Sequence, residues 1–75
     1  MQQEQASEPT IPGLTPGEVT FLALLAEGYS YLNAAARLEI SINTIRNRAR
    51  SIYAKLRVHT KSEAVAIAIR QGLVA

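Results

Sequence analysis

Residues 30–56 read SYLNAAARLEISINTIRNRARSIYAKL, and they predict two helices joined by a tight turn. Ser30 and Ser41 are both typical N-cap residues, so each is expected to begin a helix. The connection at 39–41 is too short for anything except a turn between helices that cross at a large angle. This arrangement is typical of a helix-turn-helix, although small helical bundles have equally short connections. The first of the two helices carries an apolar face of Ala34, Ala35 and Leu38.

The longer of the two helices, expected to end near residue 56, has one apolar and one polar side. At 100° per residue, its apolar side chains share a narrow seam formed by Ile42, Ile45, Ala49, Ile52 and Leu56. Three arginines within five residues repel one another, so an anionic partner accounts for them better than solvent does. Arg and Asn also pair with guanine and adenine edges in the major groove. We interpret it as a recognition helix whose polar side holds Asn43, Arg46, Asn47 and Arg50, with Thr44, Arg48 and Lys55 beyond them.

Two further helices flank this pair. The run TPGE at 15–18 is a capping box with proline at the first helical position, which predicts a helix over about 16–27. A second capping box at 60–63 opens a fourth helix that ends at Gly72. Four helices and no convincing strand predict an all-α fold, a four-helix bundle that contains a helix-turn-helix. In the fourth helix Ile67 is expected to be exposed, and the inward positions are Ala64, Val65, Ala68 and Ile69.

The chain divides into two parts by composition. Residues 1–13 are rich in Gln, Glu, Ser, Thr and Pro, and are expected to form a flexible leader or linker. Residues 14–75 carry the helical pattern and are expected to form one small domain. A domain of this size buries little apolar surface, so association with a partner is expected to stabilise it.

Composition excludes several classes of function. The 75 residues contain no Cys and one His, so disulfides, thiol nucleophiles and zinc sites lack ligands, and we expect no metal, no cofactor and no enzyme activity. The longest apolar run lies around 21–26, far short of the ~20 residues that cross a bilayer. The polar start of the chain does not resemble a signal peptide. We therefore expect a cytoplasmic protein without a membrane partner.

Charge is unevenly distributed along the chain. Lys and Arg number eight, and all of them lie after residue 36, whereas four of the six carboxylates precede it. A basic second half favours a polyanionic partner, because it raises the local concentration of phosphate groups. An ordinary solvated surface is the alternative that charge alone leaves open.

The cap residues, core positions and spacing together resemble the LuxR/GerE helix-turn-helix domain, the effector module of NarL/FixJ-type regulators. The resemblance extends over about 14–74 without a gap. The residues that carry it are Leu14, Thr15, Glu18, Leu22, 24–28, Ser30, Ala35, Arg37, Leu38, Ile40, Ser41, Thr44, Ile45, Asn47, Ile52, Lys55, Leu56, Val58, 63–65, Gly72 and Leu73.

The resemblance implies a domain that binds pseudo-palindromic promoter DNA as a dimer, with the third helix in the major groove and the fourth helix at the dimer contact. The base-reading positions of the family fall on Arg46, Asn47 and Arg50, which the helical wheel also singles out, and its backbone-clamping threonine falls on Thr44. Further phosphate contacts are expected at Asn43, Arg48, Lys55, Arg57 and Lys61. The dimer contact is expected at Ile67, Arg70 and Val74. RNA polymerase is a further expected partner.

The chain departs from the family pattern at several positions. Gly17 replaces a usual cation, and Leu32 and Asn33 replace a Lys and a Glu, so phosphate anchoring by the second helix is expected to be weak. Arg57 replaces the customary Gly after the third helix, which argues against a left-handed helix exit there. Ala34 replaces a bulky aliphatic residue, so the core there is either smaller or refilled by Tyr29, Tyr31 or Leu32.

The sequence therefore predicts sequence-specific binding of double-stranded DNA by a dimeric transcriptional regulator or its output domain. A helix-turn-helix module that binds proteins and not DNA is the alternative, supported by the expected exposure of Leu32 and Ile67.

Overall fold

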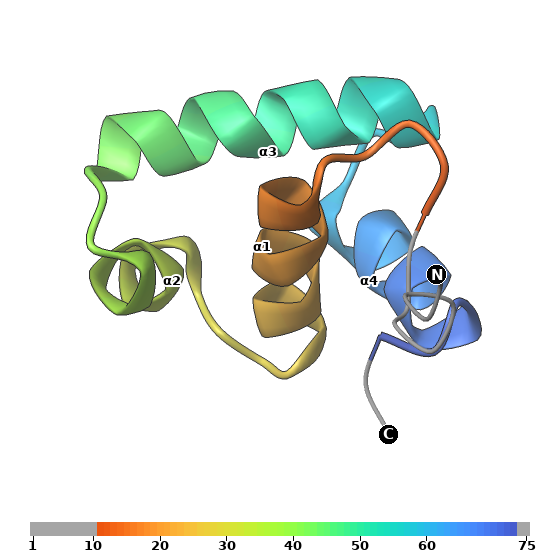
Figure 1. Cartoon of the computed structure of the whole chain (residues 1–75), viewed down its shortest axis with the longest axis horizontal. Coiled ribbons are helices and arrows are strands. Elements are labelled where there is room, and N and C mark those ends of the chain that lie inside the picture. Colours follow the sequence, from red (N-terminus) through yellow and green to blue (C-terminus); the bar gives the residue numbers. More distant parts are fainter. Residues whose placement is uncertain (1–10, 74–75) are drawn as a thin grey trace, which may run out of the picture.

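A computed structural model of the chain describes residues 11–73, and this part folds into four α-helices (Figure 1). The all-α fold class is confirmed, and the helices begin and end within about a turn of their predicted bounds. Over the described range there is no strand, and no helix is long and apolar enough to cross a bilayer. Residues 1–10 of the expected leader and Val74 lie outside it. The helices are α1 (Pro16–Ala26), α2 (Tyr31–Leu38), α3 (Ile42–Leu56) and α4 (Lys61–Arg70).

Every helix begins at a hydroxyl N-cap that the sequence predicted. The Oγ1 of Thr15 accepts the backbone N–H of Glu18, and the N–H of Thr15 donates to the Glu18 carboxylate at 2.8 Å, which completes a capping box. Thr60 and Glu63 form the same reciprocal pair at the start of α4. Ser30 and Ser41 cap α2 and α3 through single side-chain acceptors.

Both helices of the helix-turn-helix end in a left-handed residue that is not glycine. Glu39 has φ 60° at the end of α2, and Arg57 has φ 61° at the end of α3. The expectation that Arg57 disfavours a left-handed exit is wrong. Packing overrides the Cβ penalty of about 1–2 kcal/mol, because Ile40 and Val58, which follow these residues, pack on the core and donate their N–H groups to carbonyls in the last helical turn.

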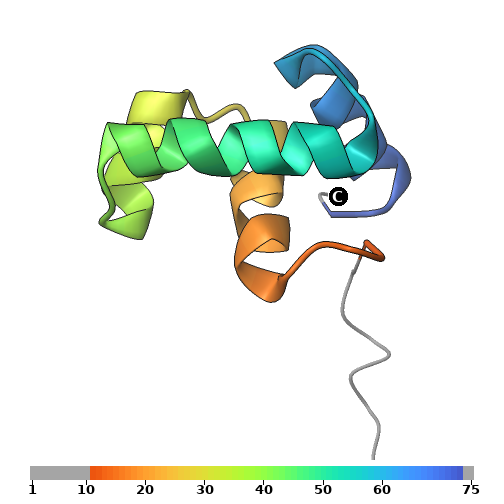
Figure 2. The same cartoon turned by 90° about the horizontal axis from the view of Figure 1, so that it is seen from above.

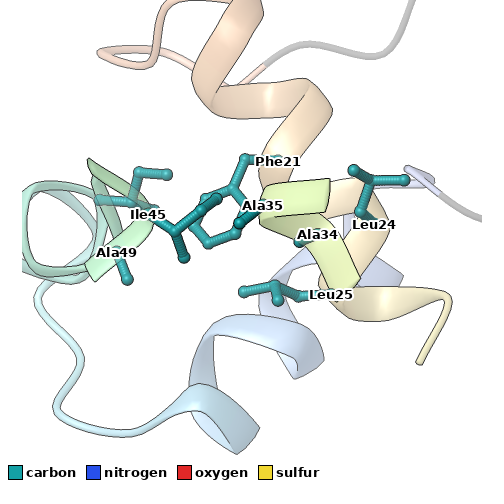
Figure 3. Packing of buried hydrophobic residues seen from close by; sticks show 8 residues of the cluster. Phe21, Leu24, Leu25, Ala34, Ala35, Ile45 and Ala49 are labelled. Atoms are coloured by element: carbon teal, nitrogen blue, oxygen red, sulfur yellow. The ribbon is translucent and has the colours of Figure 1, made fainter. Parts of the chain in front are cut away.

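The main core lies where α1, α2 and α3 meet (Figure 3). Phe21 of α1 is fully buried and points toward Ile45 of α3 and Ala35 of α2. The predicted seam of α3 is confirmed, since Ile45, Ala49 and Ile52 are all buried. Tyr29 and Tyr31 pack against this core beside Ala34, whereas Leu32 remains 68% exposed. The tyrosines therefore refill the space that Ala34 leaves, and Leu32 does not.

A second, smaller core joins α1 to α4, and it corrects three predictions. Ile11 is buried there against Leu22, Ala64 and Ala68, although the sequence analysis assigned it to the leader. Ile67, expected to be exposed, is partly buried against this cluster, and Ile69, expected to face inward, is 54% exposed.

Candidate nucleic-acid interface

The third helix lies across one side of the molecule, with α1, α2 and α4 all beneath it (Figure 1). Seen from above, none of the other three helices covers its outer side (Figure 2). The buried seam points down into the core, so the opposite arc is free to meet a partner. The exposed side chains of this arc are Asn43, Thr44, Arg46, Asn47, Arg50, Ser51 and Ala54.

A three-residue turn sets the angle between α2 and α3. Glu39 turns the chain by its left-handed conformation, and the N–H of Ile40 donates to the carbonyl of Ala35 at 3.0 Å. Ser41 then caps α3, and its hydroxyl bonds to both the N–H and the hydroxyl of Thr44. The helix-turn-helix arrangement read from 30–56 is therefore the observed one. Thr44 is exposed at the start of α3, where a phosphate-clamping residue was expected.

The three expected base-reading residues lie together on the outer arc. The Nη1 of Arg50 donates to the Oδ1 of Asn47 at 3.0 Å, which holds these two polar ends side by side. Arg46 and Arg50 line the same surface hollow. An arginine and an amide held next to each other offer paired donors and one acceptor, which is the chemistry that reads base edges in a major groove.

The side of α3 that faces α1 carries a different arrangement, which we call the α1 flank (Arg48 and Lys55 of α3, with Gly17 and Glu18 of α1). Lys55 Nζ lies 3.0 Å from both carboxylate oxygens of Glu18, whose side chain is only 12% exposed. Glu18 accepts the N–H of Thr15 as well, and these two donors hold the pKa of its carboxyl below the usual value. Lys55, expected to contact phosphate, thus forms an ion pair within the chain although its side chain remains 40% exposed. It ties the end of α3 to the start of α1.

Arg48 lies on the same flank and is partly buried. Its Nη1 is 3.8 Å from the place where a Cβ on Gly17 would stand, so its guanidinium reaches over the first turn of α1. A Cβ at Gly17 would stand in ordinary van der Waals contact with this guanidinium. The position is compatible with the expected phosphate contact.

The opposite side of α3 faces α2, and we call it the α2 flank (Arg46, Arg50, Tyr53 and Arg57 of α3, with Tyr31 of α2). The hydroxyls of Tyr31 and Tyr53 are hydrogen-bonded to each other across the two helices. Burial and this hydrogen bond raise the pKa of Tyr53, so the phenol stays protonated. The sequence analysis placed Tyr31 only as core filler, because no local pattern links residues 22 positions apart.

Lys61, another expected phosphate contact, is partly buried next to the ring of Tyr31. Its Nζ donates to the carbonyl of Tyr29 at 3.1 Å and lies 5.5 Å from the centre of the Tyr31 ring. These contacts hold the start of α2 against the start of α4. Arg57 is exposed and lines a second hollow that shares Arg50 and Tyr53 with the first one.

The expected dimer residues are only partly described. Arg70 is exposed in the last turn of α4, Ile67 packs inward, and Val74 lies outside residues 11–73. On the outer side of α4 the large exposed apolar side chain is Ile69, which the sequence analysis turned inward.

Charge on the outer arc is not compensated by the protein itself. Helix α3 contains no Asp or Glu, and the sole ion pair among residues 11–73 is the one between Lys55 and Glu18. The guanidinium groups of Arg46 and Arg50 therefore stand in an arc that attracts anions. Over this range there is also no group of three His, Asp or Glu residues that could hold a metal ion.

Comparison with known proteins agrees with this geometry. Residues 12–68 match the family described as "Bacterial regulatory proteins, luxR family". Transcriptional regulatory protein YdfI of Bacillus subtilis is 38% identical over 61 residues, which are 81% of this chain and 29% of YdfI. Response regulator protein VraR of Staphylococcus aureus is 34% identical over 61 residues, with the same two shares. The chain thus spans under a third of the length of these relatives. No solved structure matches it.

Proposed function

The chain belongs to the LuxR family of bacterial regulatory proteins, and on that premise we propose that it binds double-stranded promoter DNA as a dimer with α3 in the major groove. It is a helix-turn-helix module of transcription regulation and not an enzyme, as the sequence predicted. The whole-protein roles of YdfI and VraR, named as a transcriptional regulator and a response regulator, suggest that this module serves as the output domain of such a regulator.

The observation that carries the proposal is the outer arc of α3. Its exposed polar side chains include Arg46, Asn47 and Arg50, and no carboxylate on the helix opposes them. An α-helix fits the width of the major groove, and these side chain types pair with base edges there. The uncovered position of α3 leaves the other three helices clear of the groove (Figure 2).

We assign two kinds of contact to this surface. Arg46, Asn47 and Arg50 read base edges, because all three are exposed on the outer arc and their side-chain types pair with bases. The groups at its margins bind the phosphate backbone and fix the register of the protein on the duplex. The marginal groups are Asn43, Thr44, Arg48 and Arg57. Lys55 and Lys61 are expected to contribute less to phosphate binding, since their ammonium groups already have partners within the protein.

We propose that the dimer contact lies on α4, with Ile69 and not Ile67 at its apolar centre. Ile69 is 54% exposed and Arg70 lies beside it, whereas Ile67 packs on the second core. A two-fold contact between exposed apolar patches is the common way for small domains to pair, and it sets half-sites about one helical turn apart.

The test compares Arg50→Ala with a matched control, Arg37→Ala, an exposed arginine on α2. The preferred sequence is first selected from random duplex DNA, and affinity is then measured by fluorescence anisotropy at two salt concentrations. Arg50→Ala is expected to cost about 1–3 kcal/mol on that sequence and to relax the preference at one or two base pairs. Arg37→Ala is expected to keep the preference. An unchanged base profile for Arg50→Ala contradicts the base-reading assignment.

A protein-binding module without DNA binding is the second candidate, and one observation favours it. Leu32 on α2 and Ile69 on α4 are both large, apolar and exposed, which suits a protein contact, RNA polymerase included. The same anisotropy measurement separates the two functions. Steep loss of DNA affinity with salt and preference for one sequence support DNA binding, and the absence of both supports the protein-binding module.

A further inference from the structure

The α2 flank contains a hollow whose lining suits an oxyanion. Its lining residues come from two helices, and they are Tyr31, Arg46, Ala49, Arg50 and Tyr53. Two arginines and two tyrosines thus line one space, with no carboxylate among them. A second hollow continues from it along α3 and adds Arg57. An anion seated here meets positive charge on more than one side.

The pair of hydroxyls has one proton to spare. Tyr31 and Tyr53 share a single hydrogen bond, so one O–H donates within the pair and the other is left to donate outward. Burial keeps Tyr53 protonated by raising its pKa. Lys61, 5.5 Å from the centre of the Tyr31 ring, fixes that ring in place. The pair is therefore a neutral donor that borders the same hollow as Arg46 and Arg50.

The position of the hollow beside α3 indicates which anion it would bind. A helix in the major groove has one phosphodiester backbone on each side of it, and base-edge contacts come from the arc between them. The α2 flank lies at one margin of that arc, next to Arg46 and Arg50. At the other margin Lys55 is neutralised by Glu18, and Arg48 lies over the start of α1. The two phosphodiester backbones therefore face different side chains on the two flanks of α3.

We propose that the Tyr31–Tyr53 hydroxyl pair donates a hydrogen bond to one backbone phosphate of the bound duplex, in the hollow that Arg46 and Arg50 border while they reach the base edges. This inference rests on the proposed insertion of α3 into the major groove, and it adds two neutral residues to a contact otherwise made by cations. It also gives the hydrogen bond between the tyrosines a second role. The bond holds α2 and α3 together and aims the spare donor.

The test uses Tyr31→Phe, Tyr53→Phe and the double variant, with Tyr29→Phe as the matched control. Tyr29 also carries a hydroxyl on the α2 side, but that hydroxyl accepts from Arg37 and lies outside both hollows. Removing both partners of the pair leaves no unpaired hydroxyl behind, so the double variant is expected to fold. Thermal unfolding of each variant, recorded without DNA, checks this.

Each single variant keeps one hydroxyl that is free to donate, and it is expected to bind the selected duplex nearly as well as the wild type. The double variant is expected to bind roughly tenfold more weakly, with an unchanged salt slope because no charge is lost. Tyr29→Phe is expected to match the wild type. A purely structural hydrogen bond predicts the opposite pattern, in which the double variant binds no more weakly than the single variants.

A scan of duplexes with single methylphosphonate substitutions locates the phosphate. One position is expected to weaken the wild type more than the double variant, because the tyrosine donor is already absent from the double variant whereas Arg46 and Arg50 remain. Identical scan profiles for the two proteins overturn the inference and leave the proposed function intact. A wild type that shows no salt-dependent DNA binding at all overturns the proposed function first.

Discussion

The two flanks of α3 both carry basic residues, yet they differ in how those residues are used. On the α1 flank, Lys55 is bound to Glu18 at 3.0 Å, and Glu18 is in turn part of the cap of α1. On the α2 flank, Arg46 and Arg50 face hollows that contain no carboxylate. A basic residue in the sequence is thus a structural tie on one side of the helix and, in the function proposed above, a DNA-binding group on the other.

The two flanks show that the residues that orient α3 differ from the residues proposed to bind DNA. The bond from Lys55 to Glu18 fixes where the last turn of α3 lies relative to α1, and it does so with charges that cancel. Arg46, Asn47 and Arg50 stand on an arc whose position that bond helps to set. Removing the ion pair between Lys55 and Glu18 is therefore expected to lower stability first. Truncating the side chains of the outer arc is expected to weaken DNA binding.

The largest effect is expected from Glu18→Ala, which removes the cap acceptor and the partner of Lys55 at once. Unfolding free energy is expected to fall by about 1–2 kcal/mol in urea denaturation, because a nearly buried carboxylate with two donors is lost. Glu63→Ala is the matched control, since Glu63 forms the same capping box on α4 without an ion pair. A loss for Glu63→Ala as large as that for Glu18→Ala contradicts the role given to the tie.

A smaller effect is expected from pH. The pKa of Glu18 lies below its ordinary value of 4.5 in the folded protein, because the Thr15 N–H and Lys55 stabilise the carboxylate. Its contribution to stability is therefore complete above the unfolded pKa and is lost as the pH falls through the folded one. Urea midpoints of the wild type are expected to fall between pH 6 and pH 3.

Glu18→Gln is expected to reduce the fall of the urea midpoint between pH 6 and pH 3. The pKa of Glu63 is lowered too, by backbone N–H groups of His59 and Thr60, so Glu63→Gln should also reduce it. If Glu18→Gln keeps the full wild-type dependence, the carboxylate of Glu18 is not held as described.

The smallest effect on stability is expected from Arg57→Gly on the α2 flank. Glycine removes the Cβ penalty at φ 61°, so stability is expected to rise by about 0.5–1 kcal/mol. One phosphate-binding cation is lost at the same time, and the slope of log affinity against log salt is expected to fall by about one unit. Glu39→Gly, at the matching φ of 60° after α2, is the control. It should gain similar stability and keep the salt slope, and an equal fall in slope for both variants argues against a phosphate role for Arg57.

The sequence predicted what depends on neighbouring residues. N-caps, capping boxes and the apolar seam of α3 are set within one or two helical turns, so the bounds of the helices and the outer arc of Arg46, Asn47 and Arg50 could be derived from spacing alone. Which residue types can read bases also follows from side-chain chemistry without a structure.

The features that escaped prediction depend on contacts between distant parts of the chain. Lys55 and Glu18 are 37 positions apart, and Lys61 and Tyr29 are 32 apart, so nothing local marks these lysines as already bound. The orientation of Ile69 was mispredicted because the inward side of α4 packs on Leu22 and Ile11, which lie far from α4 in the sequence.

The account depends on contact between the outer arc of α3 and a duplex, and nuclear magnetic resonance tests this directly. Amide resonances of the isotope-labelled chain are followed as the selected duplex is added at low salt. The largest chemical-shift changes are expected in residues 43–50, with smaller ones near Tyr31 and Arg57. Changes confined to α4 or to the surface around Leu32, with 43–50 unaffected, would contradict it.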